Sequence, residues 1–485
     1  MNRERDKPCL NNGSFLFRFR SAKALLDEVA GNGGFQELEK QTIYFAKPEQ
    51  LNDPMEGLSD AFWDGDDVLW ENFFNHYALS LLWYSHKWLL HEAEDIDEAS
   101  VDAWLTEEDL PTEKFRALYH EFCSDVCSTI KTSELARILG RRTLPLRRER
   151  LSNLLFLVHQ SAVPHLFRLL KKYGLVSSEL PTAASGTNPV KTTLECWEEI
   201  ALAPPKIDMP VEDQLELMSS INNRMSHQLD LGMLTRLKST PKAQKLLALM
   251  SRFPEMYVDA FLKDLHFNPW RVACFSRQCQ NASMWGTYGS EHRGAALIFR
   301  TEQREGDHYF RVKGMTGASG SGADLKVHNV AYGKNPPPLD SFHMIGRLPM
   351  AKLEATWMTT QDGRVSTRLS EMTDDFEAWQ TRYWDHAFKR LSWKHCDWSH
   401  EDERRLIAYS VLGDDPLTYD FSQLEGIVFG MRMSNEDKLR VLSIVEKKCR
   451  ATGRTDFRFF QAYYSPSKGE MDISELRLLK FDIEE

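Results

Sequence analysis

The chain has little of what marks secreted, membrane-spanning or metal-binding proteins. Its first residues, MNRERDKPCLNNGS, contain no apolar core of the kind found in a signal peptide. No uninterrupted run of about 18 apolar residues occurs that could span a bilayer. The eight cysteines are scattered without paired spacing, as in proteins kept in a reducing compartment. We therefore expect a cytoplasmic protein that contacts no membrane.

An excess of positive charge is also missing. Lys and Arg total 60 against 71 Asp and Glu, which gives a formal net charge of −11 at pH 7. Because bulk binders of nucleic acids carry basic surfaces, we expect no such partner. The composition, 42% hydrophobic and 27% charged, is typical of a globular protein. At 485 residues the chain exceeds the usual size of one core, so we expect two domains or one domain with a large insertion.

Metal-binding patterns are equally scarce. Cys123 and Cys127 lie one helical turn apart, but no second pair of ligands accompanies them. The spacing of His395, Cys396 and His400 matches no zinc signature. The sequence therefore predicts no metal site at either place.

Residues 67–264 differ from the rest of the chain in their periodicity. Large apolar residues recur at three- and four-residue spacing over 69–95 and 112–140, as in half-buried helices, and Thr112 is placed to cap the second. The segment 177–193, rich in Ser, Thr, Pro and Gly, predicts a loop. Further helical patterns cover 151–172, 193–202, 211–229 and 241–252. We expect an all-helical insertion over 67–264 that offers a surface to a protein partner.

The most distinctive segment is 391–409, LSWKHCDWSHEDERRLIAY, in which acidic residues and two arginines precede an apolar run. If it forms a strand entered from a turn, two-residue alternation places Glu401, Glu403 and Arg405 on one face. A carboxylate pair beside an arginine is costly to bury for packing alone and less costly on the wall of a cleft. The alternative is a solvated strand edge whose charges discourage aggregation.

Other short motifs accompany this segment in a fixed order. Strands are predicted over 14–21, 272–276 and 293–299, and a turn is predicted over 52–54. The segment 424–430 is predicted to open a helix. The residues that distinguish these motifs are Arg18, Arg20, Asn52, Asp53, Pro54, Glu56, Cys274, Phe275, Ser276, Met284, Trp285, Tyr288, Gly294, Lys394 and Trp398.

In this order the motifs resemble those of the bacterial domain of unknown function 2971 family. The shared features are an Arg-bearing first strand, an Asn-Asp-Pro-x-Glu turn, a Cys-Phe-Ser … Met-Trp-x-x-Tyr block and a Trp-x-x-Glu-x-Glu-x-Arg block. The resemblance covers 14–66 and 265–450. Together with the change in periodicity, it predicts a β-rich α+β core domain made of these two parts, the helical insertion 67–264 between them, and a C-terminal extension over 451–485. The family name itself implies no activity.

The order of the parts is also remotely similar to the ADP-ribosyltransferase superfamily, which implies a split sheet and NAD as the bound nucleotide. On this resemblance Arg18 would bind the pyrophosphate or ribose. Glu403 would be catalytic, because it would stabilise the positive charge that grows on the ribose as nicotinamide leaves. Glu401 would take a proton from an acceptor. The expected binding site is completed by Ser276 as a brace, by Trp285 or Tyr288 as a stacking ring, and by Arg20, Asn52, Asp53, Glu56, Lys394 and Arg405.

Two other functions fit the same residues. The cleft could hold a nucleotide or a charged peptide without turning it over, as a binding or sensing module. Its carboxylates could instead bind Mg²⁺ in a nuclease, since hard cations prefer oxygen ligands: Asp53, Glu56, Glu401 and Glu403. A purely structural alternative places Trp285 and Trp398 in the core and leaves the carboxylates in separate ion pairs.

Overall fold

The computed structural model describes residues 14–27, 36–47, 50–53, 55–56, 59–90, 105–175, 249, 252–266, 270–314, 322–409 and 416–481. The chain divides into two compact units, each assembled from segments distant in sequence. Unit 1 comprises Met1–Leu58, Asn268–Pro337 and Phe388–Glu485, and unit 2 comprises Ser59–Phe267 and Pro338–Ala387. The patterns predicted over 177–193, 193–202 and 211–229, most of 241–252, and Pro54 lie outside the described residues.

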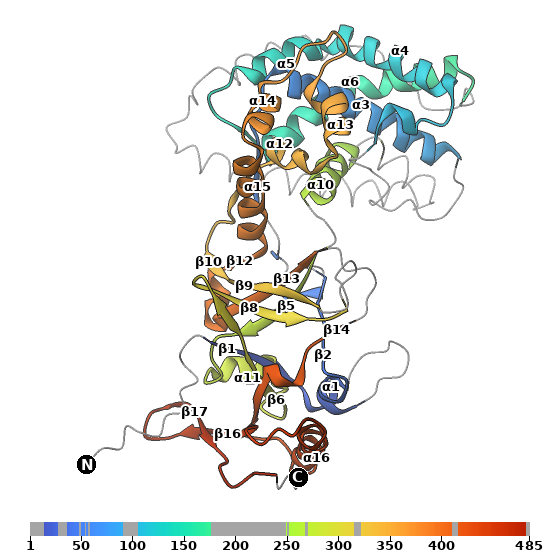
Figure 1. Cartoon of the computed structure of the whole chain (residues 1–485). Helices are drawn as coiled ribbons and strands as arrows, with labels where there is room; N and C mark the ends of the chain where they lie inside the picture. The colour runs from blue at the N-terminus through green and yellow to red at the C-terminus, as the bar shows by residue number, and fades with distance from the viewer. Residues whose placement is uncertain are drawn as a thin grey trace. The chain divides into compact units, whose positions relative to one another are not determined.

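Unit 1 is built on one sheet of ten strands. They are β1 (Phe15–Arg20), β5 (Trp270–Ser276), β6 (Ala295–Arg300), β7 (Glu302–Arg304), β8 (Asp307–Val312), β9 (Ala323–Asn329), β13 (Glu403–Tyr409), β15 (Leu424–Phe429), β16 (Arg458–Ser465) and β17 (Glu470–Glu475). Their order is β17-β16-β15-β6-β1-β5-β13-β9-β8-β7, and only β15 and β16 run parallel. Within this unit, Figure 1 shows β5, β8, β9 and β13 lying together, and β16 and β17 at the far end.

The sheet is covered on both faces. Along β6, Leu297 joins one apolar cluster and Ile298 the other, as the two-residue alternation of a strand requires. Val441 packs in the first cluster and Trp285 in the second, so the helices that carry them cover opposite faces. The helices and minor elements of unit 1 are α1 (Ala22–Leu26), α2 (Glu37–Lys40), β2 (Thr42–Ile43), α11 (Ala282–Thr287), β10 (Ala331–Gly333), β12 (Trp393–His395), the 3-10 helix η7 (Cys396–Glu401), β14 (Leu417–Thr418), the 3-10 helix η8 (Phe421–Gln423) and α16 (Asn435–Thr452).

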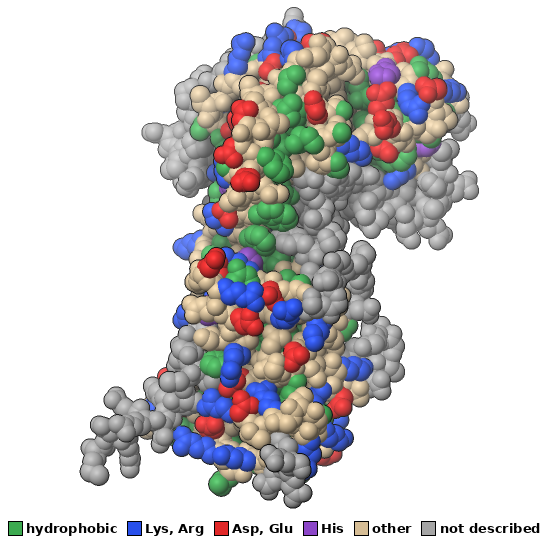
Figure 2. Space-filling model, viewed as in Figure 1, with side chains coloured by type: hydrophobic (Ala, Val, Ile, Leu, Met, Phe, Trp, Pro, Cys, Tyr) green, Lys and Arg blue, Asp and Glu red, His purple; other side chains and the backbone are tan. Residues whose placement is uncertain are grey.

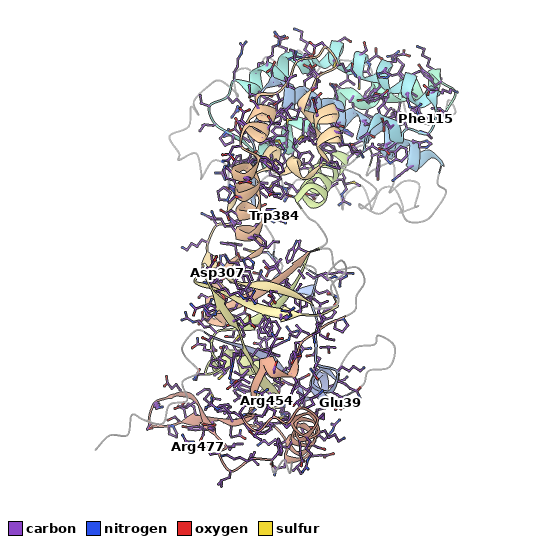
Figure 3. The ribbon with its side chains drawn as sticks, viewed as in Figure 1. Glu39, Phe115, Asp307, Trp384, Arg454 and Arg477 are labelled. Atoms are coloured by element: carbon purple, nitrogen blue, oxygen red, sulfur yellow. The ribbon has the colours of Figure 1, made fainter. Side chains whose placement is uncertain are left out.

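The end of α16 is fixed by a glycine and an arginine. Gly453 caps the helix with a φ of 67°, the left-handed conformation that glycine adopts most readily. The next residue, Arg454, is labelled in Figure 3, and its Nη1 donates to the carbonyls of Phe421 at 2.9 Å and Leu424 at 2.7 Å. The C-terminal end of α16 is thereby tied to the start of β15.

The sheet of unit 1 is nearly divided between β1 and β5. Strand β1 pairs with β6 along its whole length, but it meets β5 only at the pair Phe17–Ser276. Farther along β5, Val272 is bridged by Ala46 from the segment after β2. An opening is therefore bounded by β1, β5 and residues 44–46. The ten strands still connect in one order, so an ADP-ribosyltransferase-like split sheet stays a prediction.

Unit 2 is mainly helical. Helix α3 is buried on nearly all sides, as expected of a helix at the centre of a core. Helix α4 begins at the predicted cap, where the Thr112 side chain accepts from the amide of Phe115 at 3.4 Å. The elements are β3 (Asp60–Trp63), α3 (Asp67–Leu90), the 3-10 helix η3 (Glu107–Asp109), α4 (Glu113–Ile130), α5 (Thr132–Gly140), β4 (Leu146–Arg147), α6 (Arg148–Lys172), α10 (Phe253–His266), β11 (Pro338–Asp340), α12 (Ser341–Met344), η5 (Ile345–Arg347), α13 (Met350–Leu353), the π-helix η6 (Glu354–Met358), α14 (Thr367–Asp374) and α15 (Phe376–Leu391), which crosses the unit boundary.

The unit boundaries differ from the sequence prediction in several places. Residues 59–66 carry β3 and belong to unit 2 rather than to the core domain. Residues 338–387, expected in the core domain, also join unit 2, because Trp357 and Trp379 pack in its apolar cluster. Strands β3, β4 and β11 form a three-stranded sheet there, so unit 2 is not all-helical.

The C-terminal residues also differ from the prediction. Residues 451–485 were expected to form an extension, but β16 and β17 are two strands of the main sheet. Phe459 and Phe460 are buried in clusters on opposite faces, which ties β16 into the core of unit 1.

Candidate functional site

A cavity of about 370 Å³ lies in unit 1 where β1 and β5 diverge. Its volume is at the low end of the range for small-molecule sites. Among the residues that line it are ten of the twelve that the sequence predicted for a single site: Arg18, Arg20, Asn52, Glu56, Ser276, Tyr288, Lys394, Glu401, Glu403 and Arg405. Residues nearly 390 positions apart in the sequence are thus brought to one place, from β1, the turn after β2, β5, β12, η7, β13 and the end of α11.

Arg405 is at the centre of a buried ionic cluster on one wall of this cavity. Its side chain is fully buried, and its Nε donates to Oε1 of Glu403 at 2.7 Å. Its Nη2 donates to Oε2 of Glu56 at 3.0 Å, and its Nη1 donates to the carbonyl of Leu391 at 2.9 Å. Burial lowers the pKa of Arg405, but the carboxylates of Glu403 and Glu56 outweigh this effect and raise it, so the guanidinium stays charged.

Lys394 provides the second cation of the cluster. Its Nζ lies 2.6 Å from Oε2 of Glu401 and 3.4 Å from Oε2 of Glu403. The same Nζ lies 4.6 Å from the centre of the Trp398 ring, within the range of a cation–π contact. Burial lowers the pKa of Lys394, but Glu403 and Glu401 raise it above its usual value. Each ammonium–carboxylate contact is therefore charge-assisted.

Glu403 stays ionised although it is buried. Burial raises its pKa, but Arg405 and Lys394 outweigh burial and lower the pKa to about 2. For Glu56 the balance is the opposite, because burial raises its pKa more than Arg405 lowers it. With all groups ionised, three carboxylates face two cations, and the cluster carries one excess negative charge.

The backbone conformation that places Glu401 and Glu403 on the cavity wall differs from the predicted one. Strand β13 begins at Glu403, so Glu403 and Arg405 share a strand face as expected. Glu401 instead ends the 3-10 helix η7, and Asp402 between them has a φ of 45° in the left-handed region. The prediction that Glu401 lies on the same strand face is wrong. The left-handed turn at Asp402, rather than strand alternation, is what places both glutamates beside Lys394.

A chain of hydrogen bonds holds Glu401 from the other side. Oη of Tyr288 donates to Oε1 of Glu401 at 2.6 Å, and the side-chain amide of Asn52 donates to the same phenol oxygen. Burial raises the pKa of Tyr288, and the contact with Glu401 raises it further, so the phenol stays protonated. Oγ of Ser276 donates to the backbone carbonyl of Glu401 at 2.9 Å. Ser276 therefore braces the turn that carries the glutamates, not the carboxylate of Glu403.

The two arginines of β1 differ in their pairing. Arg20 forms an ion pair with Glu37 from α2, and its Nε donates to Oε2 of that residue at 2.7 Å. Arg18 is 7% exposed, its Nη2 donates to the carbonyl of Tyr44 at 3.0 Å, and its Nε has no hydrogen-bond partner among the described residues. Burial, helped by the nearby charge of Arg20, lowers the pKa of Arg18 to about 10. A buried cation with an unsatisfied donor on a cavity wall is suited to bind an anion.

Two of the predicted site residues do not line the cavity. Trp285 is fully buried, its Nε1 donates to the carbonyl of Cys279 at 2.7 Å, and its ring meets Phe19 edge-on at 5.0 Å. The prediction that Trp285 stacks on a ligand is therefore wrong, because its surface is already covered by the core. Asp53 is also buried, and its Oδ1 accepts from the amide of Met55 at 2.9 Å, which stabilises the turn after Asn52.

Two tyrosines near these residues are not among the site residues predicted from the sequence. Tyr44 lines the cavity and accepts the hydrogen bond from Arg18 through its carbonyl. Tyr332, on β10, accepts from the backbone amide of Glu403 at 2.8 Å. Nothing in the sequence around either residue distinguishes it, because a lone tyrosine beside one or two apolar residues is too common to identify a site.

One group of metal-ligating side chains is found among the described residues. Single ligand atoms of His395, Cys396 and Asp397 lie within 4.8 Å of one another. The contact between Nδ1 of His395 and Asp397, at 3.1 Å, accounts for much of this proximity. These residues do not line the cavity.

No family model, curated protein or solved structure matches this chain. The two family resemblances therefore stay predictions. Among the described residues, none of the helices combines the length and the apolar composition that a membrane-spanning segment requires. On the visible face of unit 1, basic and acidic side chains are interspersed (Figure 2). Exposed side chains of unit 1 also form ion pairs, among them Arg304–Asp324 and Lys326–Asp307.

Proposed function

We propose that unit 1 binds an NAD-type dinucleotide in the cavity between β1 and β5 and cleaves its nicotinamide–ribose bond, as an ADP-ribosyltransferase-like enzyme. This proposal rests on two residues that line the same cavity. Arg18 is a buried cation whose Nε has no hydrogen-bond partner among the described residues, and Glu403 has a pKa of about 2, which keeps it ionised.

The arginine end of the cavity fits an anion. A phosphate oxygen next to Arg18 would accept from the free Nε, and it would offset the burial of a charge that has no ion pair among the described residues. Arg20 lines the same cavity beside it, although Glu37 already binds its guanidinium. A pyrophosphate is therefore a suitable group at this end.

The carboxylate end fits a sugar on which positive charge develops. When the bond from the ribose carbon to nicotinamide breaks, its electron pair leaves with the nicotinamide nitrogen and positive charge grows on the ribose. The excess negative charge of the cluster would stabilise that charge electrostatically. Glu401, held by Lys394 and Tyr288, would then accept the proton that the attacking acceptor or water releases.

Binding without turnover is a second candidate. Both oxygens of Glu403 are already bound, Oε1 at 2.7 Å and Oε2 at 3.1 Å by Arg405, and Oε2 also by Lys394. A carboxylate held in this way is a rigid wall of a binding site, and it interacts less strongly with a new cation. This pairing also disfavours the Mg²⁺-dependent nuclease, because a metal would have to displace Lys394 or Arg405, and Asp53 does not line the cavity. A protein partner for the helical region stays a prediction.

The experiment that tests the proposal measures binding and cleavage separately. Calorimetry with NAD⁺ reports binding, and release of nicotinamide from labelled NAD⁺ reports cleavage. Saturable binding together with nicotinamide release supports the enzyme. Binding without release supports the second candidate, and the absence of NAD⁺ binding at millimolar concentration rejects both for this nucleotide.

A further inference from the structure

A second cavity, of about 580 Å³, lies within unit 2. Its lining residues come from α3, the residues around η3, α4, α13, and η6 with the residues that follow it. None of these belongs to unit 1, so this cavity is separate from the one described above.

The wall formed by η6 has an uncommon backbone conformation. Residues Glu354–Met358 form a π-helix, a conformation that is rare and is found often at functional sites. The side-chain amide of Asn72 holds the C-terminal end of η6, because it donates to the carbonyls of Trp357 at 2.8 Å and Thr359 at 3.1 Å. Because the amide belongs to α3, the central helix of the unit, the wall is held by the core.

The lining is acidic and rich in hydrogen-bond acceptors. Glu107 and Glu354 supply two carboxylates, and amides and threonine hydroxyls supply further oxygens, whereas no Lys or Arg is among the lining residues. One carboxylate has a partner outside the lining, since His120 Nε2 lies 2.6 Å from Oε1 of Glu107. Leu79 and Tyr119 are buried and contribute an apolar and aromatic surface. Carboxylates beside such a surface suit a ligand with a positive charge on an aliphatic chain.

A buried histidine gives a second, independent indication of a ligand. His76 lines the cavity, is 3% exposed, and has its Nδ1 2.9 Å from Oη of Tyr257. Its Nε2 has no partner in hydrogen-bond geometry among the described residues. Burial lowers the pKa of His76 to about 4, against a smaller opposing effect of the Leu105 backbone, so the ring is neutral near pH 7. When Nδ1–H donates to Tyr257, Nε2 is an acceptor for a donor in the cavity.

From these features we infer that unit 2 carries its own binding site for an aliphatic polyamine. Ammonium groups would be held by Glu107 and Glu354, the methylene chain would pack on Leu79 and Tyr119, and an N–H group would reach His76. Nothing in this assignment depends on the function proposed for unit 1, because the two sites share no residue.

The test uses the full-length protein and titrates it with spermidine in a calorimeter. The matched uncharged probe is 1,6-hexanediol, and Mg²⁺ controls for non-specific attraction to acidic residues. The test variant is Glu107→Gln/Glu354→Gln. The control variant is Glu108→Gln/Glu113→Gln, which removes the same charge from two exposed residues outside the lining.

We expect saturable binding of spermidine to the wild type and at least about fivefold weaker binding to the test variant, because each partly exposed ion pair contributes modestly. The control variant should bind as the wild type does. The inference is overturned if spermidine does not bind at millimolar concentration, if both variants weaken binding equally, or if hexanediol or Mg²⁺ gives the same binding curve. Equal melting temperatures of the two variants would show that weaker binding is not a consequence of unfolding.

Discussion

Arg405 binds both carboxylate oxygens of Glu403, two residues earlier on the same strand. Its Nε donates to Oε1 at 2.7 Å and its Nη2 donates to Oε2 at 3.1 Å. Because β13 is buried, this bidentate contact is protected from water, and the side chains are 0% and 5% exposed. The pair therefore stabilises the fold and is also part of the candidate site.

Substituting Glu403 should affect both stability and turnover. In Glu403→Gln, Arg405 and Lys394 lose a shared carboxylate, and we expect the free energy of unfolding to fall by about 3 kcal/mol or more. If Glu403 also stabilises the transition state, nicotinamide release should fall by roughly 10² to 10⁴. Thermal melts and the release assay on the same samples check the two effects.

A matched control separates these effects. Glu425 is a buried carboxylate on β15, paired with Arg300 and outside the cavity lining. Glu425→Gln should lower the melting temperature and leave the specific activity unchanged. Equal loss of activity in both variants would mean that Glu403 acts only through stability.

The strands of this region could be predicted from the sequence because their alternation is local. The predicted strand 14–21 includes all of β1, and the predicted strand 272–276 covers the last five of the seven residues of β5, since short runs of large apolar side chains reflect burial in a sheet. The motif order also predicted that Arg18, Tyr288 and Glu403 meet on one cavity. A set of polar residues with no local packing role is most simply explained by a shared site.

Other features could not be predicted because they depend on contacts distant in sequence. The left-handed conformation of Asp402 has no local signal, as aspartate is common in ordinary turns. Whether residues 338–387 belong to unit 1 or unit 2 depends on which apolar cluster Trp357 and Trp379 join. The spacing of apolar residues along the sequence does not reveal this. The burial of Trp285 likewise depends on Phe19, more than 260 residues away.

The stability that Glu403 provides should depend on pH in a defined window. Its pKa in the folded protein, about 2, lies below the usual value of 4.5, so its stabilising contribution is complete above pH 4.5 and is lost as the pH falls toward 2. This shift corresponds to about 3 kcal/mol. Urea unfolding of the wild type and of Glu403→Gln between pH 2 and 7 should show a difference that shrinks below pH 4.5. A difference that does not change with pH would contradict the lowered pKa.

The two arginines of β1 should respond in opposite ways to substitution. Arg18→Met removes a buried cation that forms no ion pair within the described part of the chain, so the melting temperature should stay the same or rise. Binding of NAD⁺ should weaken about 10- to 100-fold, the contribution of a charge-assisted hydrogen bond. Arg20→Met should instead lower the melting temperature, because Glu37 would be left buried without its partner. If Arg18→Met destabilised unit 1 as much as Arg20→Met, Arg18 would be a structural residue rather than an anion site.

Trp285 and Tyr288, one helical turn apart, provide the last test of which aromatic residue belongs to the site. Trp285→Ala opens a cavity in a packed core, so we expect a loss of about 3–5 kcal/mol, or roughly 10 °C in melting temperature. Tyr288→Phe removes only the hydroxyl that donates to Glu401 and accepts from Asn52, so it should leave the melting temperature within a few degrees and weaken NAD⁺ binding or turnover. Differential scanning fluorimetry with calorimetric titration of both variants distinguishes the roles. A stable Trp285→Ala protein with weakened NAD⁺ binding would instead require the indole to leave the core and contact the ligand.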